Sequence, residues 1–181
     1  KFDLNIIFLY SSIIMSHSDY CSEQLLTTSL NIDARSLQGD VNSLLLTKLK
    51  QKYEGVCNKD GFIKQNSLEI VNRSMGEITT INGTSYVVYQ ITYKAVVLSP
   101  VKGIKMKVYI ESVSKMGFIA YIKFSDQDTI KDSPFVVIVP KEYFEEETYN
   151  KYKQGDDLKV IVEASRIKYM SKNIQIVAKP V

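Results

Sequence analysis

Lysine and tyrosine side chains alternate on two neighbouring segments that we predict to be strands, 105–113 and 118–124. Glu111 is the one acidic residue among the lysines between Lys102 and Lys123. Lysine ammonium groups bind phosphates and tyrosine rings stack on bases, each stacked base contributing about 1–3 kcal/mol. This interleaving of charge and aromatic rings suits single-stranded nucleic acid. The outward faces of the two segments combine Lys105, Lys107, Tyr109, Ile119, Tyr121 and Lys123.

More basic residues could extend this surface, in the turn between the two strands and in the segment around Arg166. We therefore predict an RNA-binding surface that is made of Lys105, Lys107, Tyr109, Lys115, Ile119, Tyr121, Lys123, Lys168, Tyr169 and Lys172. The same pattern fits a solvated lysine face whose tyrosines merely cover a barrel. The pattern alone does not decide between these two interpretations.

Catalytic motifs are missing from the sequence. It has one histidine, His17, and two cysteines, Cys21 and Cys57, so neither a zinc site nor a nucleophile–histidine pair can be assembled. No phosphate-binding glycine loop occurs. Asp126, Asp128 and Asp132 lie in a polar segment, where we expect solvated carboxylates rather than a cation site. We predict a protein that is not an enzyme by itself, with no metal or cofactor, in a reducing compartment.

The length and composition of the chain allow one large domain or two small ones. The chain has 181 residues, is 45% hydrophobic and carries a net charge of +3. This content supports a packed core, whereas the small net charge gives no overall polyanion signature. Any nucleic-acid binding must therefore come from a local patch.

The first half of the chain has the pattern of one helix on an antiparallel sheet. We expect a strand over 25–32, then a helix from Val41 to Tyr53 with Asp40 as N-cap and Gly55 at its end. Short strands are expected at 62–63 and 67–72. We expect a loop over 76–85, centred on Asn82-Gly83, and a long buried strand over 86–98.

After Pro100 the pattern changes to one strand after another. We expect strands over 105–113, 118–124, 135–139, 158–163 and 174–178. The segment 141–152 between the third and the fourth strand is either a short helix or a loop. Five strands with one insertion at this place fit a small OB barrel. The predicted class is thus α+β, with a small α+β domain at 23–100 and an OB barrel at 101–181.

Several short motifs occur in an order that resembles a known family. The first domain contains Glu54-Gly55-x-Cys57, Gly61-Phe62-Ile63, and Gly76 with Ile81 and Gly83, followed by Tyr93-Lys94-Ala95-Val96-Val97. The barrel contains Val113-Ser114-x-Met116-Gly117-Phe118 and the closing Ile174-x-Ile176. In order and spacing these residues resemble the seventh subunit of eukaryotic RNA polymerase II and its archaeal counterpart. The resemblance covers the chain from about Leu30 to Ala178.

This resemblance implies a stalk subunit of a multi-subunit DNA-directed RNA polymerase. In that family an S-one type OB barrel meets nascent RNA, and a small helical partner subunit packs on the first domain. A tip loop docks on the polymerase core, which here points to Gly76, Ile81, Asn82 and Gly83. The family's RNA-facing aromatic positions fall at Met116 and Ile119, which leaves Tyr109, Tyr121 and Tyr169 as candidates for stacking.

Other functions remain open at this point. A free-standing RNA-binding or translation-factor-like protein would use the same barrel without a polymerase, and a structural adaptor would use it to bind protein. The composition leans to Lys, Asn, Ile, Tyr and Ser, as an AT-rich genome produces, and a large DNA virus is one such source. We expect a nuclear protein if the source is a eukaryotic cell, and a cytoplasmic viral factory or the virion if it is viral. No membrane partner is expected.

The N-terminal stretch from Phe2 to Met15 is apolar but interrupted by Asp3 and Asn5, and it is too short to span a bilayer. It fits either a signal peptide or residues upstream of a true start at Met15. We favour the second interpretation and expect 1–22 to be a disordered or non-native extension.

Overall fold

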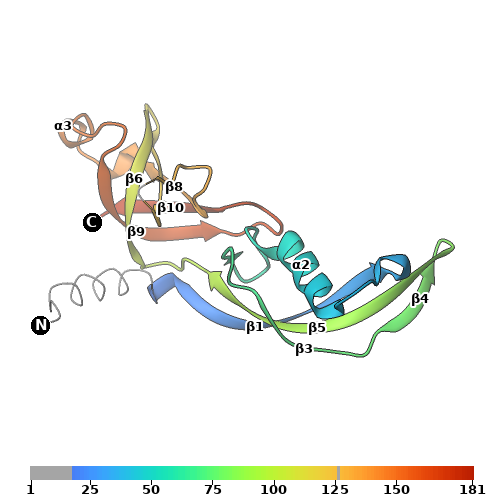
Figure 1. Cartoon of the computed structure of the whole chain (residues 1–181). Coiled ribbons are helices and arrows are strands. Elements are labelled where there is room, and N and C mark those ends of the chain that lie inside the picture. The colour runs from blue at the N-terminus through green and yellow to red at the C-terminus, as the bar shows by residue number, and fades with distance from the viewer. Residues whose placement is uncertain (1–17, 126) are drawn as a thin grey trace, which may run out of the picture. The chain divides into compact units, whose positions relative to one another are not determined.

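A long strand, β5 (Thr84–Leu98), forms the spine of the first half of the protein. We describe a computed structural model that covers residues 18–125 and 127–181. Strand β5 is flanked by β1 (Cys21–Asp33) on one side and by β2 (Phe62–Ile63) on the other. Strands β3 (Glu69–Arg73) and β4 (Glu77–Ile81) pair antiparallel with successive parts of β5. Figure 1 shows the sheet and the helix that lies on it.

Helix α2 (Val41–Tyr53) covers one face of this sheet. Asp40 caps it, because its carboxylate accepts hydrogen bonds from the backbone N–H groups of Asn42 and Ser43 at 3.1 and 3.2 Å. The helix ends before Gly55, whose φ of +73° favours glycine. Its buried side chains, four residues apart, pack on the sheet and build a core with Ile32, Ile91 and Tyr93; they are Leu45, Leu49 and Tyr53. The predicted helix and its N-cap are confirmed.

The second half of the described chain contains a closed five-stranded barrel. Its strands are β6 (Lys105–Ser114), β7 (Gly117–Tyr121), β8 (Phe135–Pro140), β9 (Asp157–Arg166) and β10 (Ile174–Pro180). The order around the barrel is β10-β8-β7-β6-β9, and β9 closes it by pairing with β10. Strands β8 and β10 run parallel, whereas the other pairs are antiparallel. The fold class is therefore α+β, with a closed barrel and an antiparallel sheet, as predicted.

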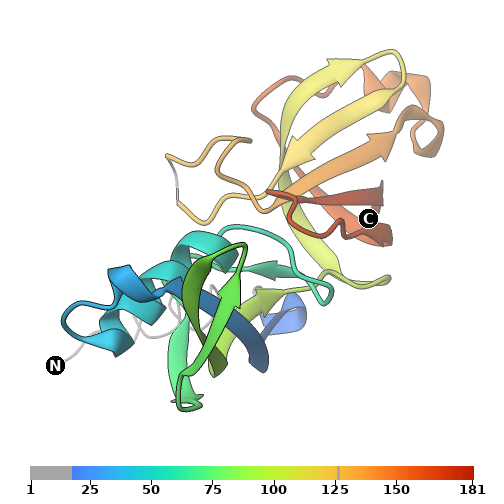
Figure 2. The same ribbon diagram turned by 90° about the vertical axis from the view of Figure 1, so that its right-hand side faces the viewer.

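Aromatic rings close one end of the barrel. Between β8 and β9 lie a 3-10 turn, η3 (Lys141–Tyr143), and a short helix, α3 (Glu146–Tyr149). Tyr149 stacks on the buried ring of Phe118 with centroids 4.5 Å apart, and Phe144 and Tyr152 pack edge-on against Phe118. The segment 141–152, for which helix and loop remained open, contains both a 3-10 turn and a four-residue helix joined by irregular residues (Figure 2).

The chain divides into two compact units. The sheet unit contains Glu23–Val56 and Ile63–Val97, and the barrel unit contains residues 18–22, Cys57–Phe62 and Leu98–Val181. Placing Cys57–Phe62 with the barrel differs from the predicted boundary near Pro100. The reason is a pair of backbone hydrogen bonds: Cys57 N–H donates to Ser171 O, and Met170 N–H donates to Cys57 O, both at 2.8 Å.

Two predicted elements were wrong. The expected loop over 76–85 is a hairpin of β4 and β5, in which Asn82 and Gly83 form the turn with φ of +51° and +76°. Its residues on either side are β-branched, and Asn-Gly between such runs is a hairpin signal. The strand expected over 118–124 ends at Tyr121, because Ile122 N–H donates to Ser133 Oγ and Phe124 N–H to Asp128 Oδ2. These backbone N–H groups therefore form hydrogen bonds with loop side chains and not with a neighbouring strand.

The N-terminal prediction is tested only in part. Residues 1–17, which include the apolar stretch and His17, lie outside the described residues. Residues 18–22 carry regular structure, contrary to the expectation, because Ser18–Tyr20 form a 3-10 turn and β1 begins at Cys21. Tyr20 is buried against Phe135. In the described part of the chain no helix has the length and apolarity to cross a membrane.

Candidate nucleic-acid interface

Four of the predicted binding residues come together on the outside of the barrel, where β6 and β7 pair. Tyr109 and Tyr121 are cross-strand partners whose ring centroids are 6.4 Å apart. Lys123 Nζ lies 4.5 Å from the centroid of Tyr109 and 5.7 Å from that of Tyr121. Lys107 Nζ lies 5.5 Å from the Tyr109 centroid. We call Lys107, Tyr109, Tyr121 and Lys123 the Lys–Tyr cluster.

The two lysines of the Lys–Tyr cluster differ in whether an acidic side chain is paired with them. Lys107 forms an ion pair with Asp157 at 3.3 Å, and both side chains are about half exposed. The hydrogen bond to Asp157 raises the pKa of Lys107 above its ordinary value. Lys123 has no ion pair with any described residue. Among the described residues, Lys123 therefore contacts only tyrosine rings, whereas the charge of Lys107 is partly neutralised by Asp157.

The rings of the Lys–Tyr cluster are less open than the sequence suggests. Tyr121 is only 8% exposed. Lys123 lies over Tyr109 and occupies one face of its ring. A base that stacks here must displace Lys123 from that face or use the rest of the Tyr109 ring. The Lys–Tyr cluster thus offers charge more readily than stacking.

An apolar row crosses the outer face beside the Lys–Tyr cluster. Ile119 of β7 lies opposite Ile138 of β8, which in turn lies beside Val177 of β10. These side chains are 39%, 42% and 37% exposed. The sequence predicted Ile119 but missed the other two, because the strand 135–139 is a continuous apolar run that does not reveal which residues face outward.

The connection from β9 to β10 carries the remaining basic residues. Lys168, Tyr169 and Lys172 lie in it, and Tyr169 is 63% exposed. The backbone hydrogen bonds to Cys57 hold this loop, and Met170 adopts a φ of +61° within it. Cys57 is fully buried, and burial raises the pKa of its thiol. The conformation of this loop is therefore fixed by a segment more than a hundred residues earlier in the chain.

Two predicted lysines stand apart from the Lys–Tyr cluster. Lys105 is exposed at the start of β6, opposite Ile161 of β9. Lys115 is exposed in the turn between β6 and β7, at the end of the hairpin opposite Lys107 and Lys123. No contact among the described residues joins either lysine to the Lys–Tyr cluster.

The predicted docking residues lie on the β4–β5 hairpin of the sheet unit. Asn82 and Gly83 form its turn, and Ile81 precedes them and is 45% exposed. At Gly76 a Cβ atom would overlap the Val87 side chain and the Tyr89 ring, so close packing requires glycine there. The hairpin also exposes Met75 by 89% and Ile78 by 81%, which the sequence did not single out. We call Met75, Ile78 and Ile81 the apolar tip.

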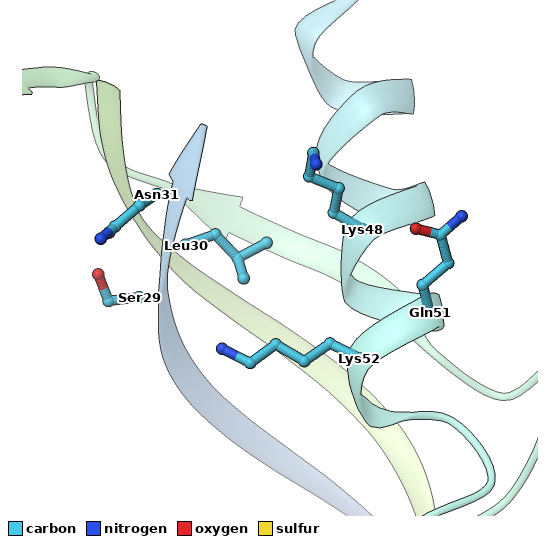
Figure 3. Close-up of a pocket in the computed structure, with 6 residues that line it drawn as sticks. All are labelled: Ser29, Leu30, Asn31, Lys48, Gln51 and Lys52. Atoms are coloured by element: carbon cyan, nitrogen blue, oxygen red, sulfur yellow. The ribbon is translucent and has the colours of Figure 1, made fainter. Parts of the chain in front are cut away.

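The sheet unit contains hollows beside helix α2. One of about 610 Å³ lies between α2 and β1, where Lys52 extends from the helix toward the strand (Figure 3). A groove of about 810 Å³ lies between α2 and β3. Within residues 18–125 and 127–181, no three acidic, cysteine or histidine side chains gather to hold a metal. Asp128 and Asp132 instead accept hydrogen bonds that fix their own loop, and Asp126 is outside the described residues.

The sequence was compared with models of protein families and with curated proteins, and neither search found a match.

Proposed function

We propose that this chain is a non-catalytic stalk subunit of a multi-subunit DNA-directed RNA polymerase. Its barrel is an OB fold of the S-one type that contacts nascent RNA, and its apolar tip docks on the polymerase core. A small helical subunit is its partner. The protein acts in the nucleus if the source is a eukaryotic cell, and in a viral factory or the virion if the source is a virus.

The OB-fold part of the proposal is carried by the order of the barrel strands. Strands β6, β7 and β8 follow one another, β10 then adds in parallel to β8, and β9 closes the barrel between β10 and β6. The helix α3 lies between the third and fourth strands of this set. Five strands in such a Greek-key barrel, with a helix at that point, support the OB assignment.

The outer surface of the barrel supports an RNA contact. OB folds bind oligonucleotides on the face of their second and third strands and on the loops after the first and fourth. Here those elements are β7, β8, the turn with Lys115 and the loop with Lys168. The Lys–Tyr cluster borders that face, and the loop adds positive charge at the other side. Positive charge combined with apolar and aromatic side chains suits single-stranded RNA.

The β4–β5 hairpin supports docking on a protein. A soluble hairpin that exposes Met75, Ile78 and Ile81 leaves apolar area in water, and such area commonly marks a protein contact. The turn at Asn82-Gly83 closes the hairpin on which Ile78 and Ile81 lie. These features agree with the tip that the resemblance to the polymerase family implies.

An alternative is a free-standing OB-fold RNA-binding or translation-factor-like protein. The Lys–Tyr cluster and the basic loop favour it equally, because both concern RNA and not the polymerase. Only the apolar tip distinguishes the two functions, since a free-standing protein has no core enzyme for the tip to bind.

Affinity purification of the tagged full chain from its native or infected cells tests the proposal. We expect large polymerase subunits and a small helical partner to be recovered. The double variant Ile78→Asp/Ile81→Asp should lose them, whereas Leu25→Asp, an equally polar change at a side chain that is 67% exposed on β1, should keep them. Recovery of RNA or ribosomal material without polymerase would overturn the stalk assignment and support the alternative.

A further inference from the structure

A small polar notch lies on the barrel where β9 ends and β10 begins. Its volume is about 180 Å³, and it is lined by Arg166, Lys168, Ser171, Asn173 and Gln175. These residues come from the end of β9, the connecting loop and the start of β10, at the end of the barrel opposite α3 (Figure 1). Among the residues that the structure describes, no carboxylate and no apolar side chain lines this notch.

The hydrogen-bond donors of the notch are not used within the described protein. The side chains of Arg166, Lys168 and Gln175 make no hydrogen bond or ion pair with any described residue, and the same holds for Asn173. Ser171 Oγ instead donates to the backbone oxygen of Asn173 at 2.6 Å. Its role is therefore to hold the loop, while the guanidinium, the ammonium and two amide groups remain available.

The notch is held in shape before any ligand arrives. Arg166 and Gln175 are cross-strand partners in the β9–β10 ladder, so their backbones are fixed by that ladder. Cys57 binds the loop on both sides of Met170, accepting from Met170 N–H and donating to Ser171 O. Ser171 N–H also donates to Lys168 O at 3.0 Å. The backbone of the notch is therefore ordered before binding, so that a ligand orders only the exposed side chains of Arg166, Lys168 and Gln175.

We infer that the notch binds one phosphate group of the backbone of a single RNA strand. Arginine matches the oxygens of a phosphate with two parallel N–H donors, and lysine and amide groups add further donors without any competing acid. The polar, cationic lining suits a phosphate better than an uncharged base. This inference rests on the proposed RNA contact of the barrel.

The strand register favours RNA over a phosphorylated peptide, because it places a second cationic group at the other end of the same row of side chains. Across the outer face, Tyr109 lies opposite Tyr121, Tyr121 opposite Val136, and Val136 beside Gln175, which pairs with Arg166. The Lys–Tyr cluster and the notch are therefore two ends of one row of side chains. Adjacent strands are about 4.8 Å apart, so an extended strand of RNA can cross β7, β8 and β10 along this row. Phosphates at both ends would then meet a cation.

Binding of a fluorescent twelve-nucleotide oligouridylate to the full chain, measured by anisotropy over a range of salt concentrations, tests the inference. We compare the wild type with Arg166→Gln/Lys168→Gln. The matched control is Lys151→Gln/Lys153→Gln, which removes the same charge from exposed lysines at the α3 end of the same barrel. The notch variant should bind roughly tenfold more weakly, with the slope of log K against log salt reduced by about 0.7. The control should change the affinity less than twofold.

Three outcomes contradict different parts of the inference. Equal binding by the notch variant and the control would overturn the notch while leaving the RNA contact in place. No binding of the oligouridylate by the wild type would overturn both the RNA contact and the notch as its subsite. Loss of binding to a phosphoserine peptide, but not to RNA, in the notch variant would overturn RNA as the ligand. The variant Arg166→Lys keeps the positive charge but removes the two parallel N–H donors of arginine. This loss alone should weaken binding about threefold.

Discussion

The Lys–Tyr cluster and the notch carry similar charge at two ends of one face, but they differ in what their cations already contact. In the Lys–Tyr cluster, Lys107 is paired with Asp157 and Lys123 lies over a tyrosine ring. In the notch, Arg166 and Lys168 have no partner among the described residues. A phosphate that binds at the Lys–Tyr cluster must compete with these existing contacts, whereas one that binds at the notch does not.

This difference shows what the spacing of basic residues can and cannot reveal. Alternation along β6 correctly placed Lys107 and Tyr109 on one outer face. It could not show that Asp157, fifty residues later, would lie opposite Tyr109 and bind Lys107. Availability of a charge depends on long-range pairing, and the sequence pattern contains only local spacing.

The largest expected effect comes from Gly117→Ala, which should destabilise the barrel and thereby disrupt both the Lys–Tyr cluster and the notch. Gly117 has a φ of +144°, and a Cβ there would overlap the backbone oxygen of Val139 on β8. Because the neighbouring atoms are backbone, they cannot move aside cheaply. We expect a loss of about 3 kcal/mol or more in the free energy of unfolding, measured with urea.

Gly155→Ala is the control for this prediction. Its φ of +94° also strains a side chain, but no atom lies within 4 Å of the new Cβ. We expect a loss of about 1–2 kcal/mol from backbone strain alone. If both variants lost the same stability, the close packing of β7 on β8 would not be the reason for glycine at position 117.

The second prediction removes the ion pair of Lys107, so that the lysines of the Lys–Tyr cluster lack an acidic partner, as the cations of the notch do. Asp157→Asn removes the partner of Lys107 and frees its ammonium group for phosphate. We expect oligouridylate to bind about threefold more tightly at low salt, with a salt slope that is steeper by about 0.7. Asp156→Asn, which also removes one negative charge from an exposed neighbour without an ion pair among the described residues, is the control. A gain equal to that of the control would mean that general charge, and not the release of Lys107, governs binding.

The third prediction separates the two lysines of the Lys–Tyr cluster. Lys123→Gln should weaken binding of the oligouridylate about threefold to fivefold, because Lys123 has no ion pair among the described residues. Lys107→Gln should weaken it less than twofold, since Asp157 already offsets much of its charge. The combined change of Lys107, Tyr121 and Lys123, with Phe at position 121 to preserve packing, should lower both the affinity and the salt slope. Unchanged values in the triple variant would contradict the assignment of the Lys–Tyr cluster to RNA.

The elements of the fold were largely predictable, because local signals agreed with the tertiary structure. Asp40 capped the helix where the sequence predicted it, and the four-residue spacing of Leu45, Leu49 and Tyr53 identified the buried face. The five barrel strands were found within a few residues of their ends, since proline, glycine and polar loops separate them. The exceptions were the β4–β5 hairpin and the end of β7.

The notch could be predicted only in part by the same reasoning. Lys168 and the segment around Arg166 were expected to extend the basic surface, but the sequence did not group them with Ser171, Asn173 and Gln175. Gln175 and Asn173 are ordinary polar residues whose importance comes only from the ladder that sets Gln175 opposite Arg166. The loop between them is fixed by Cys57, which belongs to the first half of the chain. In the sequence Cys57 belongs to a family motif, whereas in the structure its backbone hydrogen bonds hold the loop. Sites that depend on long-range register and on backbone hydrogen bonds leave no spacing signal.

The smallest expected effect concerns a third group of cations on the barrel, which resembles the Lys–Tyr cluster and not the notch. Glu163 accepts from Lys179 at 2.5 Å and from Lys102 at 3.2 Å, and the hydrogen bonds to these lysines lower the pKa of Glu163. A carboxylate with a lowered folded pKa contributes stability above its unfolded value of 4.5, and that stability is lost as the pH falls through the folded value. Glu163→Gln should therefore reduce stability slightly at neutral pH and should flatten the loss of stability below about pH 4.5.

Urea unfolding of the wild type and Glu163→Gln between pH 3 and pH 7 measures this difference. RNA binding at neutral pH gives the second readout. Lys102→Gln/Lys179→Gln should leave the affinity for oligouridylate nearly unchanged, because both lysines are already paired with one carboxylate. If this variant weakened binding as much as Arg166→Gln/Lys168→Gln, pairing within the protein would not determine which cations meet RNA. The affinity for RNA would then depend on the total charge of the barrel and not on whether each cation is already paired.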